Sequence, residues 1–314
     1  MIFERRFLLG ALVVAIFFPL LGWSEYVIHV GVLIMFAIML ATGFNLIVGY
    51  VGEFSLGHTA FLGIGAYTAA LLSSSLGMPI YFNIVAAAVI AAIAGLFIGA
   101  VTLRLRGPFF VIVTLCFAEV LRIVANNWVS VTNGPMGIAG IVKPEWMAQQ
   151  SALQQKVDFY YIGLALVVIC IYFAYRFVYS FLGRAVVTIR ENRFVAQSVG
   201  IWPYYYSLLA FVVASAMAGV AGAFYAHYVS YVGPEVFGFP FMISMIIMVL
   251  LGGKGTLLGP VIGPIIVVLL EEYLRDFKDL RFSIFGLVII VVVLFLPQGL
   301  MGFVAARREQ YARK

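Results

Sequence analysis

The stretch "GYVGEFSLGHTAFLGIGAYTAALL", from Gly49 to Leu72, places a glutamate and a histidine among small residues in an otherwise apolar chain. The polar groups are Glu53 and His58. Charged groups inside a bilayer are costly and usually functional. The stretch therefore indicates a special place in a membrane protein, either a close helix contact or part of a polar path.

Composition sets the class of protein. The chain has 314 residues, of which 64% are hydrophobic and 10% are charged. Soluble domains carry roughly 25% charged residues, so we expect an all-α, polytopic membrane protein surrounded by lipid. The net charge of +6 is small. It is better explained by the charge asymmetry of membrane loops than by binding to nucleic acid.

Apolar runs long enough to cross a membrane recur along the chain. A spanning helix needs about 20 mostly apolar residues. The sequence predicts a single transmembrane domain, a helical bundle of about ten spans (eight to ten), near 7–23, 28–48, 54–75, 81–103, 108–126, 159–179, 207–228, 236–253, 256–273 and 282–303. The first run lacks a signal-peptidase site, so we expect it to be retained. The eighth and ninth runs are short and rich in glycine, so they could instead form a re-entrant hairpin.

The basic residues predict the orientation. If the N-terminus is cytoplasmic, 13 of the 19 Lys and Arg residues fall inside, and the other six are Arg122, Lys143, Lys156, Arg275, Lys278 and Arg281. Cytoplasmic loops carry the excess of positive charge. We therefore expect both termini to be cytoplasmic, 127–158 to be extracytoplasmic and 180–206 to be cytoplasmic.

Few motifs suggest chemistry. Residues 252–256, "GGKGT", lack the Gly-Lys-Ser/Thr order of a phosphate-binding loop, so ATP hydrolysis would belong to other chains. No spacing indicates a metal site or a catalytic set, so we do not expect an enzyme. Glu119 and Arg122 are three residues apart, which allows a structural ion pair on one helix face; a role in transport is the alternative.

The cytoplasmic segment 180–206 has a second distinctive pattern. Residues 184–199 contain no proline and no interior glycine, which predicts one short helix that stops at Gly200. The helix would carry arginines together with Val195 and Val199. This pattern suits an amphipathic helix on the membrane surface, and it equally suits a docking helix for a cytoplasmic partner.

Several stretches together resemble one family, the LivM-type permeases of branched-chain amino acid ABC importers. They are "GYVGEFSLGHTAFLGIGAYTAALL", "FVIVTLCFAEVLRIVANNWVSVTNGPMGI", "GRAVVTIRENRFVAQSVGI", "GGKGTLLGPVIG" and "PQGLMGF". They occur in the order of the family and extend from about residue 30 to 303. The family often has Gln or an acidic group where Glu53 stands, so this position does not identify the substrate.

The resemblance implies an assembly in the cytoplasmic (inner) membrane of a bacterium. It implies a second, homologous permease chain, two cytoplasmic ATPase subunits and an extracytoplasmic amino-acid-binding protein. This permease itself would hold no cofactor, since ATP is used by the partner subunits. The resemblance also favours docking over membrane binding for the segment 180–206, with the coupling residues Arg190, Glu191, Asn192, Arg193, Ala196 and Gly200.

The opening stretch can then be interpreted as part of the translocation path. We expect the path to include Glu53, Ser55, Gly57, His58, Thr59 and Gly63. On a continuous helix Glu53 and His58 would point about 140° apart, so a shared path requires a break in the backbone between them. The alternative is that the glycines only pack helices and that Glu53 lies at the cytoplasmic interface.

Two functional alternatives remain open at this level. Related permeases serve urea, short amides or aromatic amino acids, and a separate binding protein selects the substrate. A stand-alone secondary transporter or channel would instead use Glu53, His58, Glu119 or His227 as ion sites.

The orientation has a direct test. Reporter fusions after Arg193 and after Lys314 should both report cytoplasm, because the arginine-rich segments stay inside. A fusion after Lys143 should report the outer side. A cytoplasmic signal from the Lys143 fusion would contradict the ten-span arrangement.

Overall fold

The structure is a computed structural model of the chain. It describes residues 2–105, 107–147 and 149–275, and a few positions between 283 and 302. The predicted span 282–303 and the C-terminal arginines lie largely outside the described residues.

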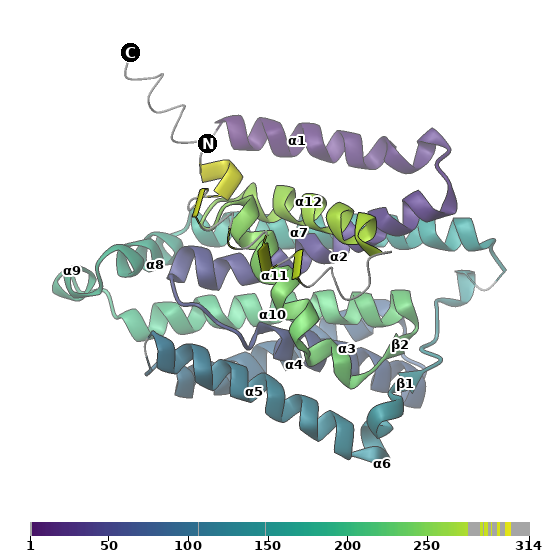
Figure 1. Ribbon diagram of the computed structural model, residues 1–314, viewed down its shortest axis with the longest axis horizontal. Helices are drawn as coiled ribbons and strands as arrows, with labels where there is room; N and C mark the ends of the chain where they lie inside the picture. Colours follow the sequence, from purple (N-terminus) through teal and green to yellow (C-terminus); the bar gives the residue numbers. More distant parts are fainter. Residues whose placement is uncertain are drawn as a thin grey trace.

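The chain forms an all-α bundle, as the composition predicted (Figure 1). Its main helices are α1 (Ile2–Phe17), α2 (Glu25–Asn45), α3 (His58–Leu76), α4 (Ile80–Thr102), α5 (Pro108–Asn127), α7 (Ala152–Val178), α10 (Pro203–Val229), α11 (Phe239–Gly252) and α12 (Gly259–Tyr273). Short elements are η1 (Phe18–Leu21), η2 (Leu46–Val51), α6 (Val129–Thr132), η3 (Gly134–Met136), η4 (Glu145–Met147), α8 (Phe181–Glu191), α9 (Arg193–Ser198) and η5 (Pro234–Phe237). The described strands are β1 (Ile138–Ala139) and β2 (Tyr231–Val232), which pair antiparallel.

Local sequence signals set many helix ends. Pro108 and Pro203 stand in the first turns of α5 and α10, where a missing N–H costs nothing. The Ser151 side chain caps α7 by accepting a hydrogen bond from the Gln154 N–H. Gly77 ends α3 in the left-handed conformation (φ +61°) that glycine adopts without strain.

Six helices of the described chain are long and apolar enough to cross a membrane, namely α2 with η2, α3, α4, α5, α7 and α10. Helices α11 and α12 have 14 and 15 residues, or about 21–23 Å at 1.5 Å per residue. The hydrocarbon core is about 30 Å thick. They pack against each other as a hairpin, whose glycines allow the backbones to touch: a Cβ on Gly263 would collide with the Met248 carbonyl.

Helix α10 lies in the middle of the bundle and packs on α2, α3 and α4. Small residues permit the close approach. A side chain on Gly65 of α3 would collide with the backbone of Gly219 on α10, and one on Gly222 would collide with the Leu62 carbonyl. In lipid such packing replaces the hydrophobic drive between helices.

Consecutive long helices alternate in direction, so the two ends of the bundle differ (Figure 1). Helices α8 and α9 lie at one end, and α6, β1 and β2 lie at the other. The segment 127–158 is folded: Asn133 adopts a left-handed turn, and its side chain donates to the Gly137 carbonyl at 2.9 Å. Asn133-Gly134-Pro135 therefore forms a turn.

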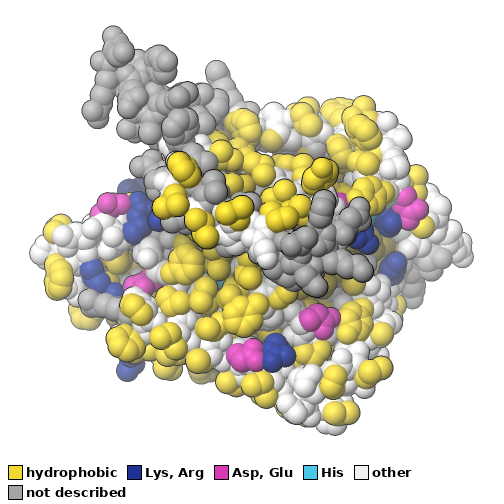
Figure 2. All heavy atoms as spheres, viewed as in Figure 1, with side chains coloured by type: hydrophobic (Ala, Val, Ile, Leu, Met, Phe, Trp, Pro, Cys, Tyr) yellow, Lys and Arg dark blue, Asp and Glu magenta, His cyan; other side chains and the backbone are white. Residues whose placement is uncertain are grey.

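The surface between the two ends is mainly hydrophobic, as Figure 2 shows for one face. Helix α4 carries no charged residue and exposes a row of large apolar side chains, among them Tyr81, Val85, Val89 and Phe97. A face of this kind is suited to lipid.

Candidate functional site

A break in the backbone lies at the centre of the opening stretch. Helix α2 continues through the π-helical turn η2 and stops at Gly52, whose φ of +82° favours glycine. Residues 52–57 are irregular, and α3 begins at His58 with Gly57 as its N-cap. The interruption that a shared path would require between Glu53 and His58 is thus present. π-Helical turns are also frequent at functional sites.

The residues expected along the path lie close together and are mostly buried. Ser55, His58 and Thr59 are at most 1% exposed, whereas Glu53 is half-buried. The Thr59 hydroxyl donates to the Phe237 carbonyl at 3.1 Å, which ties α3 to η5.

The two glycines of this set occupy close contacts. A Cβ on Gly57 would collide with the Thr114 carbonyl on α5, and one on Gly63 would collide with the ring of Phe237. In this structure both positions therefore pack elements together and do not border open space. Glycine is required at each for a steric reason.

His58 is the least expected group of the set. Its ring is enclosed by Phe44 and Phe61, with ring centroids 5.5 and 6.1 Å away. Neither ring nitrogen has a hydrogen-bond partner among the described residues. Nearly all buried polar groups in proteins form hydrogen bonds. An apolar ring at this position would avoid the free-energy cost of burying two nitrogens, so the histidine suggests that the nitrogens bind a ligand or water.

Arg190 connects α8 to the end of α2. Its Nη1 donates to the Gly49 carbonyl in η2 at 2.6 Å, and its Nη2 pairs with Glu191 at 2.7 Å. Its aliphatic stem lies against Gly52, where an added Cβ would lie 2.6 Å from the arginine Cγ. A carbonyl left over at a helix end thus receives a charge-assisted bond from the segment 180–206.

Asn45, the last residue of α2, bonds the turn between α11 and α12 next to Arg190. Its side chain accepts from the Gly255 N–H and donates to the Thr256 carbonyl, each at 2.8 Å. A Cβ on Gly255 would lie 2.8 Å from Arg190 Nη1 and 2.9 Å from the Gly49 carbonyl oxygen. We call these contacts of Arg190 and Asn45 the junction; it joins α8, the helix break and the α11–α12 turn.

The segment 180–206 differs from the single helix that was predicted. Asn192 is extended (φ −157°, ψ 108°) and separates α8 from α9. Its side chain accepts hydrogen bonds from the N–H groups of Phe194 and Val195, and so caps α9. An Asn side chain that bonds nearby backbone N–H groups competes with continuation of the helix. The prediction of one continuous helix over 184–199 was therefore wrong. Gly200, with φ +82°, stops α9 as predicted.

The other coupling residues fall on different sides of this segment. Ala196 is buried, Glu191 is exposed and Arg193 is half-buried. The tip that projects from the bundle is apolar: Phe194, Val195, Val199 and Trp202 are 53–76% exposed. Val195 and Val199 were visible as an i, i+4 pair in the sequence. The local sequence around Phe194 and Trp202 does not indicate that their side chains are exposed.

Glu119 and Arg122 form the ion pair that their spacing allows, in a forked geometry with Nη2 2.6 Å and Nε 2.9 Å from the carboxylate oxygens. The side chains are 41% and 40% exposed. Glu119 also borders a small pocket with Leu56, Thr59 and Phe237. His227, another candidate ion site, is buried, and its Nε2 lies 3.1 Å from Nδ2 of Asn83.

Most of the chain is similar to known proteins. Residues 7–296 match the family described as branched-chain amino acid transport system / permease component. The high-affinity branched-chain amino acid transport system permease protein LivM of Escherichia coli K12 is 33% identical over 95% of this chain and 75% of its own length. The corresponding LivH of the same organism is 26% identical over 84% of this chain and 90% of its own length. No solved structure matches. The chain therefore belongs to the permease family of branched-chain amino acid transport systems.

Proposed function

We propose that the chain is a membrane permease subunit of an ABC importer that moves branched-chain or other hydrophobic amino acids. Separate subunits hydrolyse ATP, and the permease sits as a multi-pass protein in the inner membrane of a bacterium with both termini cytoplasmic. The observation that carries the proposal is the junction, because it connects an exposed apolar tip to the helix break through Arg190.

The tip and the junction suggest how the permease receives force from an ATPase. The exposed apolar side chains of the tip, Phe194, Val199 and Trp202, are unfavourable in water, and a groove on an ATPase subunit would bury them. Motion of the tip would be transmitted to Arg190 through the short helices α8 and α9. Arg190 then moves the Gly49 carbonyl, and so the end of η2 next to the break.

The partners follow from the family and from the two ends of the bundle. The curated relatives include two kinds of permease, LivM and LivH, named for one type of system; a second permease chain of that kind would complete the pore. Two ATPase subunits would dock at the α8–α9 end. The folded segment 127–158, at the opposite end, would receive an extracytoplasmic binding protein.

The path itself is proposed along the helix break, past Glu53, Ser55, Gly57, His58, Thr59 and Gly63. Two observations support it. The backbone there is irregular, which is tolerated at membrane depth only where protein or a water-filled cavity covers it, and the His58 nitrogens have no hydrogen-bond partner among the described residues. A path here would be closed in this conformation, because Gly57 and Gly63 are packed against Thr114 and Phe237.

Co-expression tests the assembly. A tagged form of this chain, expressed with its candidate partners, should retain two ATPase subunits and a second permease. In vesicles the complex should take up leucine only when ATP and the binding protein are present. Uptake by this chain alone, driven by an ion gradient, would favour a stand-alone transporter. Urea uptake without leucine uptake would identify the related amide systems.

Arg190 provides the test of coupling. Arg190→Gln removes the charged donor from the Gly49 carbonyl, a bond to a charged group worth about 1.5–3 kcal/mol. Uptake per ATP hydrolysed should therefore fall by about tenfold or more, while the ATPase subunits still co-purify. The matched control is Arg184→Gln, since among the residues that the structure describes Arg184 donates locally, to the Tyr179 carbonyl. Equal uptake by the two variants would exclude the junction as the link.

His58 separates a path from simple packing. His58→Phe suits the aromatic surroundings and removes both unpaired nitrogens, so a packing role predicts full uptake and a stability that is equal or higher. The path predicts a loss of uptake with assembly retained. Glu53→Gln should have a mild effect if the carboxylate only accepts hydrogen bonds, and a severe one if its charge orients an ammonium group. Normal uptake by both variants would place the path elsewhere.

A further inference from the structure

A groove lies between α1 and the rest of the bundle, and we call it the α1 groove. Its volume is about 570 Å³, and its lining residues come from α1, α2, α7, α12 and the α11–α12 turn. The volume falls in the range of small-molecule sites, roughly 300–1,000 Å³. The candidate path residues are not among the described residues that line it. The α1 groove is therefore a place in the fold that the proposed transport path does not use.

Helix α1 forms one wall of the groove because it is attached to α7 near its own C-terminal end. The Tyr160 hydroxyl of α7 donates to the Ala15 carbonyl at 2.9 Å, and the Phe18 ring stacks on Tyr160 with centroids 5.8 Å apart. Toward the N-terminus, Leu8 and Leu12 line the groove. Figure 1 shows α1 along one side of the bundle.

The walls of the α1 groove are apolar over most of their extent. Met35, Ile38 and Val167 line its floor and are at most 7% exposed, whereas Leu9 and Val168 on its rim are 54% and 40% exposed. Water needs polar partners to stay in a cavity, and these side chains offer none. An unfilled groove loses dispersion contacts. A hydrocarbon chain therefore suits these walls.

Positive charge stands at one end of the groove. Arg176 is the charged residue among those that line it. The arginine is exposed, and it forms no hydrogen bond or ion pair with any of the described residues. Tyr172 and Tyr175 line the same part, and tyrosines are enriched where a membrane meets water. A guanidinium presents its donors in a fork that matches phosphate oxygens.

The length of the groove matches one leaflet of a bilayer. Along α7 it extends from Leu164 to Arg176, which is about 18 Å at 1.5 Å per residue. Half of the hydrocarbon core is about 15 Å thick. Arg176 is two residues from the end of α7, next to α8. An acyl chain in the groove therefore places its head group beside Arg176, at the end of the bundle that holds α8.

We propose that the α1 groove binds one phospholipid. An acyl chain lies between α1 and α7, and the phosphate accepts hydrogen bonds from Arg176. Lipid tails are as apolar as the walls, so the phosphate contact supplies the selectivity over the surrounding bilayer. Basic pockets between membrane helices on the cytoplasmic side are known to hold anionic head groups. The site does not depend on which solute the permease transports.

The bound lipid lies beside the junction. Leu257 lines the groove and is 6% exposed. It follows Thr256, whose carbonyl accepts a hydrogen bond from Asn45. Arg176 stands in the last turn of α7, and α8 begins at Phe181. One lipid molecule thus contacts the two segments of chain that lead into the junction.

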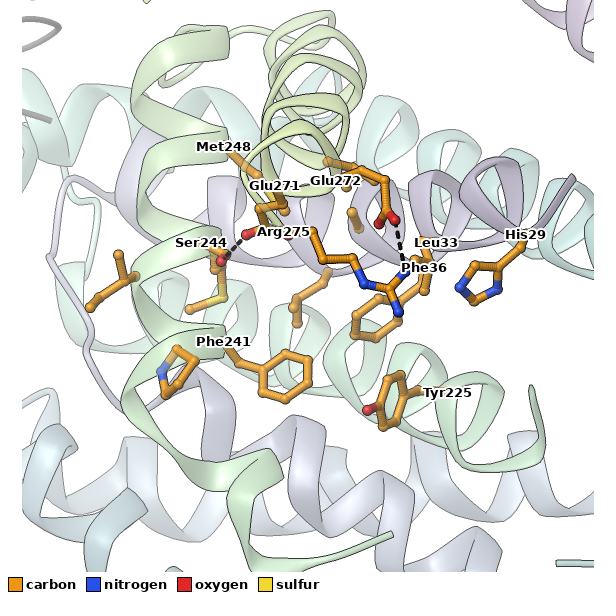
Figure 3. A pocket seen from close by; sticks show the side chains of 16 residues that line it. His29, Leu33, Phe36, Tyr225, Phe241, Ser244, Met248, Glu271, Glu272 and Arg275 are labelled. Carbon is orange, nitrogen blue, oxygen red and sulfur yellow. Dashed lines mark hydrogen bonds and ion pairs between the residues drawn. The ribbon is translucent and has the colours of Figure 1, made fainter. Parts of the chain in front are cut away.

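The cavity in Figure 3 is a site of a different kind. Its volume is about 450 Å³, and it lies between α2, α10, α11 and α12. The charged groups that border it already bond within the protein: Glu272 accepts from Arg275 at 2.9 Å, and Ser244 donates to Glu271. An acyl chain against these groups would take charges away from water, which is costly. The α1 groove, with one charge at its end, fits a lipid better.

The test counts bound lipid. The chain is purified in detergent with the partner chains it retains, stripped of native lipid and titrated with dimyristoylphosphatidylglycerol, and native mass spectrometry counts the molecules bound. Dimyristoylglycerol has the same acyl chains without a phosphate, and glycerol 3-phosphate has the phosphate without the chains. We expect a saturable site in each copy of this chain that binds the phospholipid at least tenfold more tightly than the diacylglycerol. Glycerol 3-phosphate should not displace it.

Matched variants assign the site to the groove. Arg176→Gln removes the charged donor and should weaken binding about tenfold or more, and Val168→Trp should abolish the site by filling the groove. The controls are Arg104→Gln and Val85→Trp. Arg104 is exposed and lies beside the Tyr204 ring after α4, and Val85 is 62% exposed on the apolar face of α4. Both controls should bind lipid like the unmodified chain.

Several results would overturn the proposal. They are equal binding by Arg176→Gln and Arg104→Gln, equal binding of the diacylglycerol, and displacement by glycerol 3-phosphate, which would identify a site for free phosphate. Loss of a partner chain from Val168→Trp, with lipid binding unchanged, would show that protein covers the groove. Leucine uptake and co-purification of ATPase subunits are separate measurements, so failure of the lipid site would leave the proposed function intact.

Discussion

The need to satisfy backbone groups at a helix break constrains most of this structure. The chain stops one helix at Gly52 and starts the next at His58, and the backbone groups released at the break need other partners. Arg190 reaches the Gly49 carbonyl from α8, and Asn45 bonds the α11–α12 turn. The break is therefore held by two other parts of the chain, and it cannot move without them.

Glycine supplies the second requirement, which is close approach. Around Arg190 a side chain at Gly52 or Gly255 would displace the guanidinium stem or head. The same principle brings α3 and α10 together at Gly65 and Gly219. Bundle contacts that lack room for a Cβ are intolerant of change, whereas the open apolar face of α4 needs only hydrophobicity.

Much of this arrangement could be predicted from the sequence, because apolar runs and turn residues act locally. The runs at 108–126 and 81–103 became α5 and α4 with small shifts at their ends, and Gly200 ends α9 as expected. The split at Asn192 was missed because its capping bonds compete on nearly equal terms with one more helical turn. The target of Arg190 is 141 residues away, and no periodicity encodes such a contact.

The shortness of α11 and α12 has an electrical consequence. At about 21 Å for 14 residues, α11 covers roughly two-thirds of the hydrocarbon thickness, and its glycine turn meets the irregular end of α2. Where a hairpin this short forms part of a membrane barrier, the insulating layer is thinner and the membrane voltage falls over a shorter distance. Moving a net charge costs about 2.3 kcal/mol per 100 mV, but a zwitterion carries none. A solute of that type would cross such a thinned barrier with little electrical work, whereas stray ions would meet the full field.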